Sequence, residues 1–344
     1  MVWYNSSWAN AVQITVVHAQ VGANQTNFPC YVDLSILPAG FFTGVRTDGG
    51  DIRITQSDGT TEVAREIVAI NTTSKTGEVH FNAPSLSSTA DTSFYIYFNN
   101  PSATAYAANA TYGKYNVWDS NYKSVYHFNG NSNDSTSNQN NGTDTSVTYG
   151  ASYAKLNGGQ GANFNGTSSK ITRTYANIGT TISVDTWFNL ASLTTTEAYI
   201  SFMSTLFQAA SGATPLYYYP DTSGGSNGPS TSPTVNLSTF YHWAITITGT
   251  TQNFYFNGAQ QGTANTTATN SVNTVNNSTE TIGAWGSGRY WSGSLDELRI
   301  SSVTRALSWY STQYNNQNSP STFYTVGTVL KNVSGGGIMA FFMK

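Results

Sequence analysis

The sequence predicts an all-β protein made of two β-sandwich domains. Segments in which polar and apolar residues alternate, such as 13–17 and 51–56, follow one another along the chain, as expected for strands with one buried face. Asp58-Gly59 and Asn257-Gly258 lie beside such segments and favour hairpin turns, because glycine accepts a positive φ. Helical periodicity is confined to a short piece at 306–314. Regular strand–turn spacing without long helices favours sandwiches over a parallel α/β sheet.

The composition supports this fold class and restricts the function. Only 9% of the 344 residues are charged but 14% are aromatic, and an aromatic-rich chain is not a disordered one. The net charge of −3 provides no basic surface for nucleic acid or for an anionic membrane. No apolar run approaches the ~18 residues of a membrane-spanning helix. The single cysteine, Cys30, allows neither an internal disulfide nor a cysteine-based zinc site.

We expect four segments along the chain. Residues 1–102 form the first sandwich, residues 103–117 a linker without periodicity, and residues 118–330 the second sandwich. Residues 331–344 form a tail in which three glycines precede an apolar peptide that contains Ile338, Met339, Phe341 and Phe342. Such a tail either docks into a neighbouring subunit, by burial or strand addition, or packs back on its own domain.

The second unit resembles laminin-G-like or concanavalin A-like domains. The matching pieces occur in order at 118–122, 125–128, 133–142, 164–166, 242–244, 255–258 and 293–300. The last piece resembles the closing strand of that family, and the resemblance implies a jelly roll. The first ~100 residues are similar to a domain of unknown function that precedes such jelly rolls in bacterial and phage surface proteins. That similarity is carried by 49–54, 58–60 and 95–101.

The family resemblance implies a candidate calcium site, because many laminin-G-like domains bind one Ca²⁺ through a loop aspartate and carbonyl oxygens. Asp134 is the candidate ligand, with Asn138 and Asn140 in the same oxygen-rich loop and Asp296 as a partner from the closing strand. The alternative is an ion-free loop in which Asx turns satisfy the backbone. Glu297 and Arg299 are interpreted as a structural salt bridge on one strand face.

We expect no enzymatic activity. Glycanases of concanavalin-like folds use two carboxylates on one strand face, which requires acidic residues at alternate positions. None of the nine acidic residues from Asp119 onward is two residues from another. The histidines, which are His18, His80, His127 and His242, show no metal-ligand spacing. We expect His127 and His242 to be half-buried strand residues rather than catalytic bases.

Weak glycan binding is a further expectation, since aromatic rings stack on sugars and amide groups orient sugar hydroxyls. The candidate aromatics are Tyr217, Tyr218 and Tyr219 in a long loop, and Trp285, Tyr290 and Trp291 around a Gly-Ser-Gly turn. The alternative is that these aromatics fill the core or an intersubunit contact.

The start of the sequence lacks the basic and apolar regions of a secretion signal, whereas the composition is typical of extracellular surfaces. These two features favour a non-enzymatic structural protein of a bacteriophage virion, as a capsid decoration, a fibre or a tail-associated subunit. It would assemble in the host cytoplasm with other virion subunits or as a homo-oligomer, helped by a surface with little charge repulsion. Two alternatives stay open: an adhesin or sheath subunit of a prokaryotic cell surface, and a glycoside hydrolase.

Overall fold

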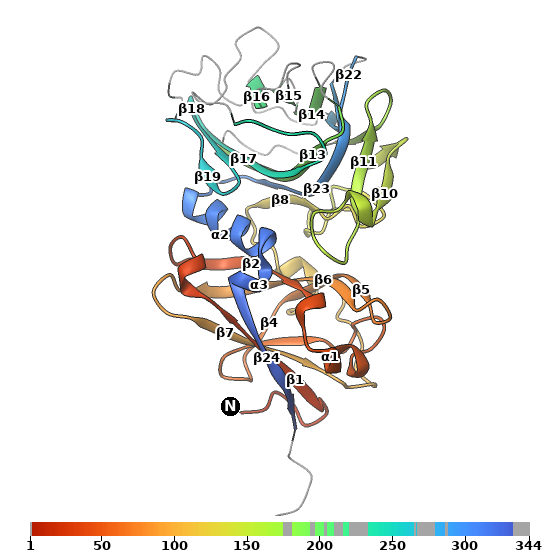
Figure 1. Cartoon of the computed structure of the whole chain (residues 1–344), viewed down its shortest axis with the longest axis vertical. Coiled ribbons are helices and arrows are strands. Elements are labelled where there is room, and N and C mark those ends of the chain that lie inside the picture. The colour runs from red at the N-terminus through yellow and green to blue at the C-terminus, as the bar shows by residue number, and fades with distance from the viewer. Residues whose placement is uncertain are drawn as a thin grey trace, which may run out of the picture.

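Two β-sandwiches are stacked along the long axis of the molecule in the computed structural model (Figure 1). The predicted all-β class is therefore confirmed. The structure describes residues 2–174, 181–192, 197–202, 205–209, 216–219, 233–264, 266, 279–285 and 288–332. Within these ranges, no helix has the length and apolarity that crossing a bilayer requires.

The first domain packs a five-stranded sheet, in the order β24-β1-β7-β3-β4, against a three-stranded sheet, in the order β2-β6-β5. Its strands are β1 Asn10–Val16, β2 Gln25–Asp33, β3 Arg53–Gln56, β4 Glu62–Val63, β5 Arg65–Asn71, β6 Thr76–Leu86, β7 Thr92–Phe98 and β24 Tyr324–Lys331. Three short helices lie in the connections from β1 to β3: η1 His18–Gln20, η2 Leu34–Ile36 and α1 Ala39–Gly44. All strand pairs are antiparallel.

The hairpin expected at Asp58-Gly59 joins β3 to β4. Gly59 has a φ of +81°, the left-handed conformation for which glycine is suited. One carboxylate oxygen of Asp58 accepts hydrogen bonds from the backbone N–H groups of Thr60 and Thr61, both at 2.8 Å. The side chain therefore closes the turn, as Asx turns do.

The last described strand, β24, returns to the first domain. It pairs with β1 from Asn10 opposite Lys331 to Val16 opposite Tyr324, and so forms an edge of the five-stranded sheet. The expected boundary, which gave residues 118–330 to the second sandwich, is wrong at its end. Sequence pattern does not separate the two sandwiches at this point, because either one accepts a strand with one apolar face.

The segment expected as a linker packs closely on the first domain. Backbone N–H of Arg65 donates to the carbonyl of Tyr112 at 3.2 Å, and the guanidinium of Arg53 lies 4.2 Å from the ring centre of Tyr106. A single turn, η3 Lys114–Asn116, precedes the second domain. The two domains are thus joined by an ordered connection.

The second domain contains an eight-stranded and a six-stranded sheet, with a short two-stranded ribbon. Its strands are β8 Tyr122–Tyr126, β9 Thr143–Thr145, β10 Thr148–Gly150, β11 Gly161–Asn165, β12 Lys170–Thr174, β13 Thr181–Leu190, β14 Glu197–Phe202, β15 Thr205–Ala209, β16 Leu216–Tyr219, β17 Phe240–Thr248, β18 Thr251–Phe256, β19 Ala259–Gln260, β20 Thr279–Ile282, β21 Ala284–Trp285, β22 Arg289–Tyr290 and β23 Ser292–Ser301. The eight-stranded sheet has the order β10-β11-β23-β13-β17-β18-β19, with β8 also pairing with β23; the six-stranded sheet has the order β16-β15-β14-β20-β12-β9. A short helix, η4 Ala151–Tyr153, follows β10.

Helix α2 Leu307–Asn318 lies between the two domains and confirms the short helix expected near 306–314 (Figure 1). Asn316 donates to the carbonyl of Tyr31 in the first domain at 2.9 Å and accepts from its N–H at 2.7 Å. Gln317 accepts a hydrogen bond from the indole N–H of Trp187 in the second domain at 2.6 Å. Helix α3 Pro320–Phe323 then leads into β24.

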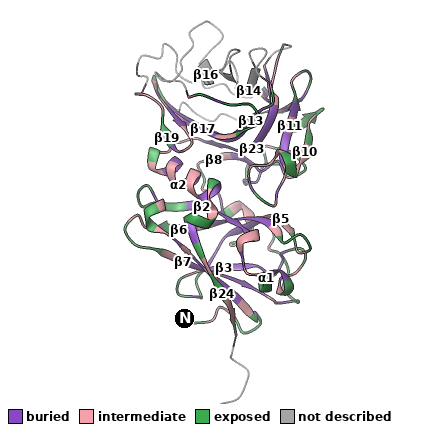
Figure 2. Ribbon diagram, in the orientation of Figure 1, coloured by how far each residue is buried: buried purple, intermediate pink, exposed green. Residues whose placement is uncertain are grey.

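One apolar core continues from the first domain across this junction, and a second core fills the second sandwich. The first includes Phe81 and Phe94 of the first domain, but also Val125 and Tyr255 of the second. Buried segments accordingly continue on both sides of the junction in Figure 2. We call this junction the seam.

Candidate functional site

The seam is formed by the outward faces of two sheets. In β6, Val79 and Phe81 pack into the first core, so Glu78 and His80, at the alternate positions, face the other way. In β23, Leu298 and Ile300 pack into the second core, and Glu297 and Arg299 face the seam. Period-two alternation would normally place such polar residues in water, but here each sheet covers the other.

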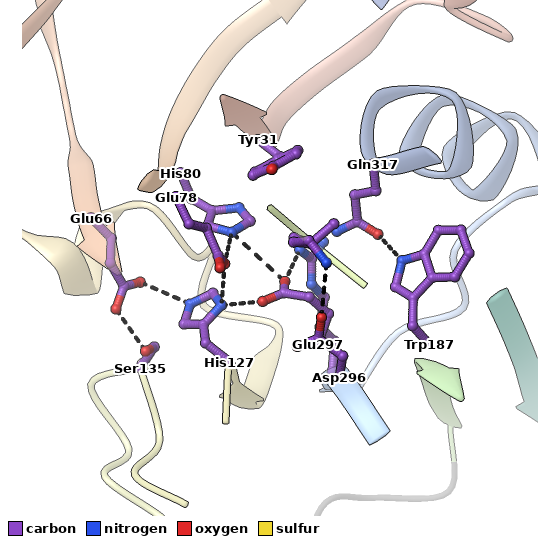
Figure 3. A network of polar contacts seen from close by, with 12 residues as sticks. Tyr31, Glu66, Glu78, His80, His127, Ser135, Trp187, Asp296, Glu297 and Gln317 are labelled. Atoms are coloured by element: carbon purple, nitrogen blue, oxygen red, sulfur yellow. Dashed lines mark hydrogen bonds and ion pairs between the residues drawn. The ribbon is translucent and has the colours of Figure 1, made fainter. Parts of the chain in front are cut away.

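Four polar side chains converge at the centre of the seam (Figure 3). Glu78 and His80 come from the first domain, and Glu297 and His127, which follows β8, come from the second. One nitrogen or oxygen atom of each lies within 4.8 Å of the corresponding atoms of the others. His80 Nε2 is 3.0 Å from Glu78 Oε1 and 3.8 Å from Glu297 Oε2. We call these four residues the seam cluster. All four are buried, with exposures of 5% or less.

Glu297 owes its direction to an irregularity in β23. The pairing of β13 with β23 shifts between Asp185 and Trp187, and Glu297 has a φ of +52°, as bulged residues can have. Its carboxylate contacts His127 Nδ1 and accepts a hydrogen bond from Arg299 at 2.5 Å. The predicted Glu297–Arg299 salt bridge is therefore confirmed, although it lies in the seam rather than on an open strand face.

Glu66, on β5, holds the far side of the His127 ring. Its Oε2 lies 3.4 Å from His127 Nε2. The same carboxylate accepts hydrogen bonds from the indole N–H of Trp118 at 2.9 Å and from the hydroxyl of Ser135 at 2.7 Å. Both nitrogens of His127 thus face carboxylates, one from each domain.

The protonation of these groups follows from burial and from neighbouring charges. Burial disfavours the charged form of His127, but Glu297 and Glu66 outweigh it and raise the pKa well above its usual value. Burial also opposes ionisation of Glu297, yet the positive charges of His127 and Arg299 hold its pKa well below the usual range.

The two remaining cluster residues shift towards their neutral forms. Burial lowers the pKa of His80 to about 3, and burial together with the charge of Glu297 raises the pKa of Glu78 well above its usual value. The charges of the cluster therefore lie on one pair, in which His127 is positive and Glu297 is negative. Glu78 and His80 are kept neutral by the same surroundings.

A polar groove gives access to the seam beside Glu66 and His127. One cavity of ≈ 190 Å³ is lined by these two residues, by Lys114 and Ser135, and by three asparagines, Asn129, Asn131 and Asn133. A second cavity of ≈ 320 Å³ shares Glu66 and Lys114 with the first and continues along β5 to Tyr106. We call the two cavities together the seam groove.

The candidate calcium ligands are not among the residues that line this groove. The Asp134 carboxylate accepts backbone N–H groups of Val125, Thr136 and Asn140 at 2.9–3.0 Å, and the hydroxyl of Thr136 at 2.9 Å. The side-chain amide groups of Asn138 and Asn140 donate to backbone carbonyls of Tyr122 and Lys123. These contacts are those of an Asx-type loop that satisfies its own backbone.

Asp296, the expected partner of Asp134, bonds to a different loop. Its Oδ2 accepts the backbone N–H groups of Lys155 at 2.7 Å and Leu156 at 3.1 Å. Asp134 and Asp296 thus accept hydrogen bonds from different loops, and calcium binding stays a prediction.

The candidate glycan aromatics fall into three groups. Trp291 is fully buried in the second core, so its expected surface position is wrong; a strand next to a glycine-rich turn can direct a side chain to either face. Trp285 and Tyr290 are half-buried on the β21–β22 ribbon. Tyr217, Tyr218 and Tyr219 belong to β16 rather than to a loop, and their side chains lie outside the described residues. Residues 333–344 of the predicted tail, including Ile338, Met339, Phe341 and Phe342, also lie outside the described residues, whereas Lys331 belongs to β24.

The seam cluster itself was not predicted. Histidine spacing along the chain gave no signal, whereas the folded chain brings the rings of His80 and His127 to a centroid distance of 4.8 Å. His127 and His242 were expected to be half-buried and are buried. The available signal was the repeated Glu-x-His and Glu-x-Arg alternation at 78–80 and 297–299, which marks polar strand faces but not that they meet.

Comparison with known proteins identifies the second domain. Residues 163–310 match the family model described as the concanavalin A-like lectin/glucanases superfamily, of laminin G type. The second domain is therefore a concanavalin A-like jelly roll, as the sequence resemblance implied. The similarity of the first 100 residues to a domain of unknown function stays a prediction. No curated protein matches the chain.

Several solved structures are similar to parts of the chain. Domain 4 of an extracellular arabinanase from Geobacillus stearothermophilus, in complex with arabinotriose, is 23% identical; the similarity covers 55% of this chain and 96% of that one, with a TM-score of 0.46. The binding domain of Paraclostridial Mosquitocidal Protein 1 is 15% identical over 57% of this chain and 52% of that one, with a TM-score of 0.47. A sialidase of Trypanosoma rangeli is 10% identical over 73% of this chain and 43% of that one, with a TM-score of 0.46. We draw no conclusion on function from these three.

Proposed function

We propose that this chain is a non-enzymatic glycan-binding structural protein, and that the seam groove is its binding site. The observation that carries the proposal is the lining of the groove. Three asparagines, a serine and a lysine line the smaller cavity, and amide and hydroxyl groups offer both donors and acceptors, as sugar hydroxyls do. Tyr106 adds aromatic surface at the far end. The lectin and glucanase superfamily of the second domain agrees with a carbohydrate ligand.

The engagement of the carboxylates supports binding without hydrolysis. Glycoside hydrolysis needs two carboxylates free to act on one glycosidic bond. Seven acidic side chains of the second domain are held by protein donors: Asp119 by Arg305, Asp134 by its loop, Asp144 by Ser132 and Tyr149, Asp185 by Gln313, Glu280 by Arg173, Asp296 by Lys155 and Leu156, and Glu297 by Arg299.

A glycan panel tests this proposal. We expect the chain to retain a neutral oligosaccharide at millimolar to micromolar affinity, and Asn131→Ala or Lys114→Ala to weaken that binding by about tenfold, since each removes one or two hydrogen bonds. Asn253→Ala, which changes a separate cavity at Thr246 and Arg305, is the control. Equal affinity of all variants for the oligosaccharide would show that the seam groove is not the binding site. Release of reducing sugar from any polysaccharide would show that the chain is a glycoside hydrolase and not a non-enzymatic binding protein.

We further propose that the chain is a structural subunit of a bacteriophage virion. It is supported by a composition with only 9% charged residues, which limits electrostatic repulsion in a dense array. Mass spectrometry and negative-stain imaging of purified particles should then find the chain in the particle in many copies. Recovery from the cell envelope fraction instead would favour the adhesin or sheath alternative.

A further inference from the structure

The seam cluster has the donor set of a metal centre. Two imidazoles and two carboxylates are ligands that Zn²⁺ accepts, and here their donor atoms lie within 4.8 Å of one another. His127 Nδ1 is 3.5 Å and His80 Nε2 is 3.0 Å from Glu78 Oε1. Tetrahedral coordination with bonds of about 2.1 Å places its ligand atoms about 3.4 Å apart. The two separations from Glu78 Oε1, and the 3.8 Å between His80 Nε2 and Glu297 Oε2, therefore lie near this value, whereas His127 Nδ1 and Glu297 Oε1 are in direct contact and would move apart when an ion enters.

The surroundings of His127 add an independent observation. Histidines that bind a metal usually donate their other ring N–H to a carboxylate, which fixes the ring and its tautomer. His127 directs Nδ1 towards Glu78 and Glu297, while Nε2 faces Glu66 at 3.4 Å. Glu66 is itself fixed by two hydrogen bonds, from Trp118 and Ser135. It has the place of an outer carboxylate that orients a ligand.

Burial and charge point the same way. The side chains of Glu78 and Glu297 are exposed by only 2% and 1%, so both can be ionised together only where enough cations balance them. A divalent cation balances both, and Arg299, which donates to Glu297, then supports the ligand from outside. The seam groove, lined by His127 and Glu66, gives an ion a route from solvent.

We propose that Glu78, His80, His127 and Glu297 bind one divalent transition-metal ion, with Zn²⁺ as the best match. Each domain contributes two ligands, and four protein ligands close the coordination sphere, as in structural rather than catalytic zinc sites. The ion would therefore connect the two domains, independently of whether the groove binds a glycan.

Metal analysis of the full chain tests this proposal. The chain, purified without a metal-affinity tag, should contain one Zn²⁺ equivalent by mass spectrometry. After removal of metal by a chelator, Co²⁺ should restore one equivalent and give the visible d–d bands of tetrahedral coordination, and Zn²⁺ should raise the Tm. Metal is offered both to the folded chain and during refolding, so that slow access to a buried site does not hide binding. A chain without bound metal, Co²⁺ bands or a shift in Tm in either protocol would overturn the proposal.

Matched variants assign the ligands. Glu78→Gln keeps the shape of the side chain but removes the ligand charge, and should weaken Co²⁺ binding by at least about 100-fold. Glu66→Gln, outside the coordination sphere, should weaken it by about 10- to 100-fold. Glu280→Gln makes the same change at a buried carboxylate that pairs with Arg173 in the second domain, and should leave Co²⁺ binding unchanged. Circular dichroism confirms folding of each metal-free variant, and binding by Glu78→Gln with unchanged affinity and spectrum would contradict the assignment.

Discussion

Two buried carboxylates in this protein lie beside an arginine and yet respond to burial in opposite ways. Glu280, in β20, contacts Arg173 of β12 within the second domain, and burial raises its pKa to about 7 against the attraction of that arginine. Glu297, at the seam, is equally buried, but its pKa is held well below the usual range. Burial alone therefore does not decide the charge of a carboxylate in this fold.

The number of neighbouring cations makes the difference. Glu280 has a single cation, Arg173, to offset the loss of hydration. Glu297 is attracted by two cations, His127 and Arg299, and His127 in turn owes part of its charge to Glu66 of the first domain. The comparison shows that a second cation, itself held in its charged form by a carboxylate from across the seam, can stabilise a buried charge that one arginine alone does not stabilise.

The largest effect is expected from Glu297→Ala. Removing this carboxylate leaves His127 and Arg299 buried beside each other without their shared partner, and breaking such a buried pair costs about 3–5 kcal/mol. We expect a loss at the upper end of that range, about 5 kcal/mol, in the free energy of unfolding measured with urea. A loss below about 1 kcal/mol would show that the seam charges are not interdependent.

Glu280→Ala should cost less, about 3 kcal/mol, because only Arg173 loses its partner. The double variant Arg173→Met with Glu280→Leu should recover most of that loss, since a balanced pair inside one core can be replaced by apolar groups. Urea denaturation of the single and double variants measures both values. If the double variant were as unstable as Glu280→Ala, the Arg173–Glu280 pair would stabilise the fold by more than the balance of its two charges.

The pH dependence of stability should separate the two carboxylates further. The folded pKa of Glu280 is about 7 and the ordinary value is 4.5, so between these values the folded chain holds a proton that the unfolded chain has lost. Stability should therefore fall as pH rises through this window, by roughly 2–3 kcal/mol from this group. Glu280→Gln should flatten the curve relative to the unmodified chain. Parallel curves for the two proteins would contradict the raised pKa.

The smallest effect is expected from Tyr126→Phe. The Tyr126 hydroxyl accepts a hydrogen bond from Arg173 and donates one to the carbonyl of Asn140 at 2.5 Å. Losing these bonds should cost about 1 kcal/mol, measured as a small decrease in Tm. Because the ring stays in the second core, a decrease comparable with that of Glu280→Ala would mean that the tyrosine, not the carboxylate, stabilises Arg173.

Local pattern predicted individual strands well and their partners poorly. The alternating segment at 51–56 contains β3, and the Asn257-Gly258 step has positive φ at both residues, as a tight hairpin requires. These features depend on a few neighbouring residues. The contact of His127 with Glu297 joins positions 170 residues apart, and strand alternation specifies a polar face without saying which other face covers it. Trp291 shows the same limit, since an aromatic beside a glycine-rich turn fits both a surface and a core.

The pairing of β24 with β1 has a consequence for how the chain folds during synthesis. A ribosome releases the N-terminal residues first, and domains generally fold in that order. Here, the five-stranded sheet lacks its edge strand β24 until Tyr324–Lys331 has emerged, after every strand of the jelly roll has been made. The jelly roll can therefore be complete while β1 still has an open edge, and open edges pair readily with foreign strands. A ribosome-bound chain stalled before residue 324 should thus be the species most prone to aggregation.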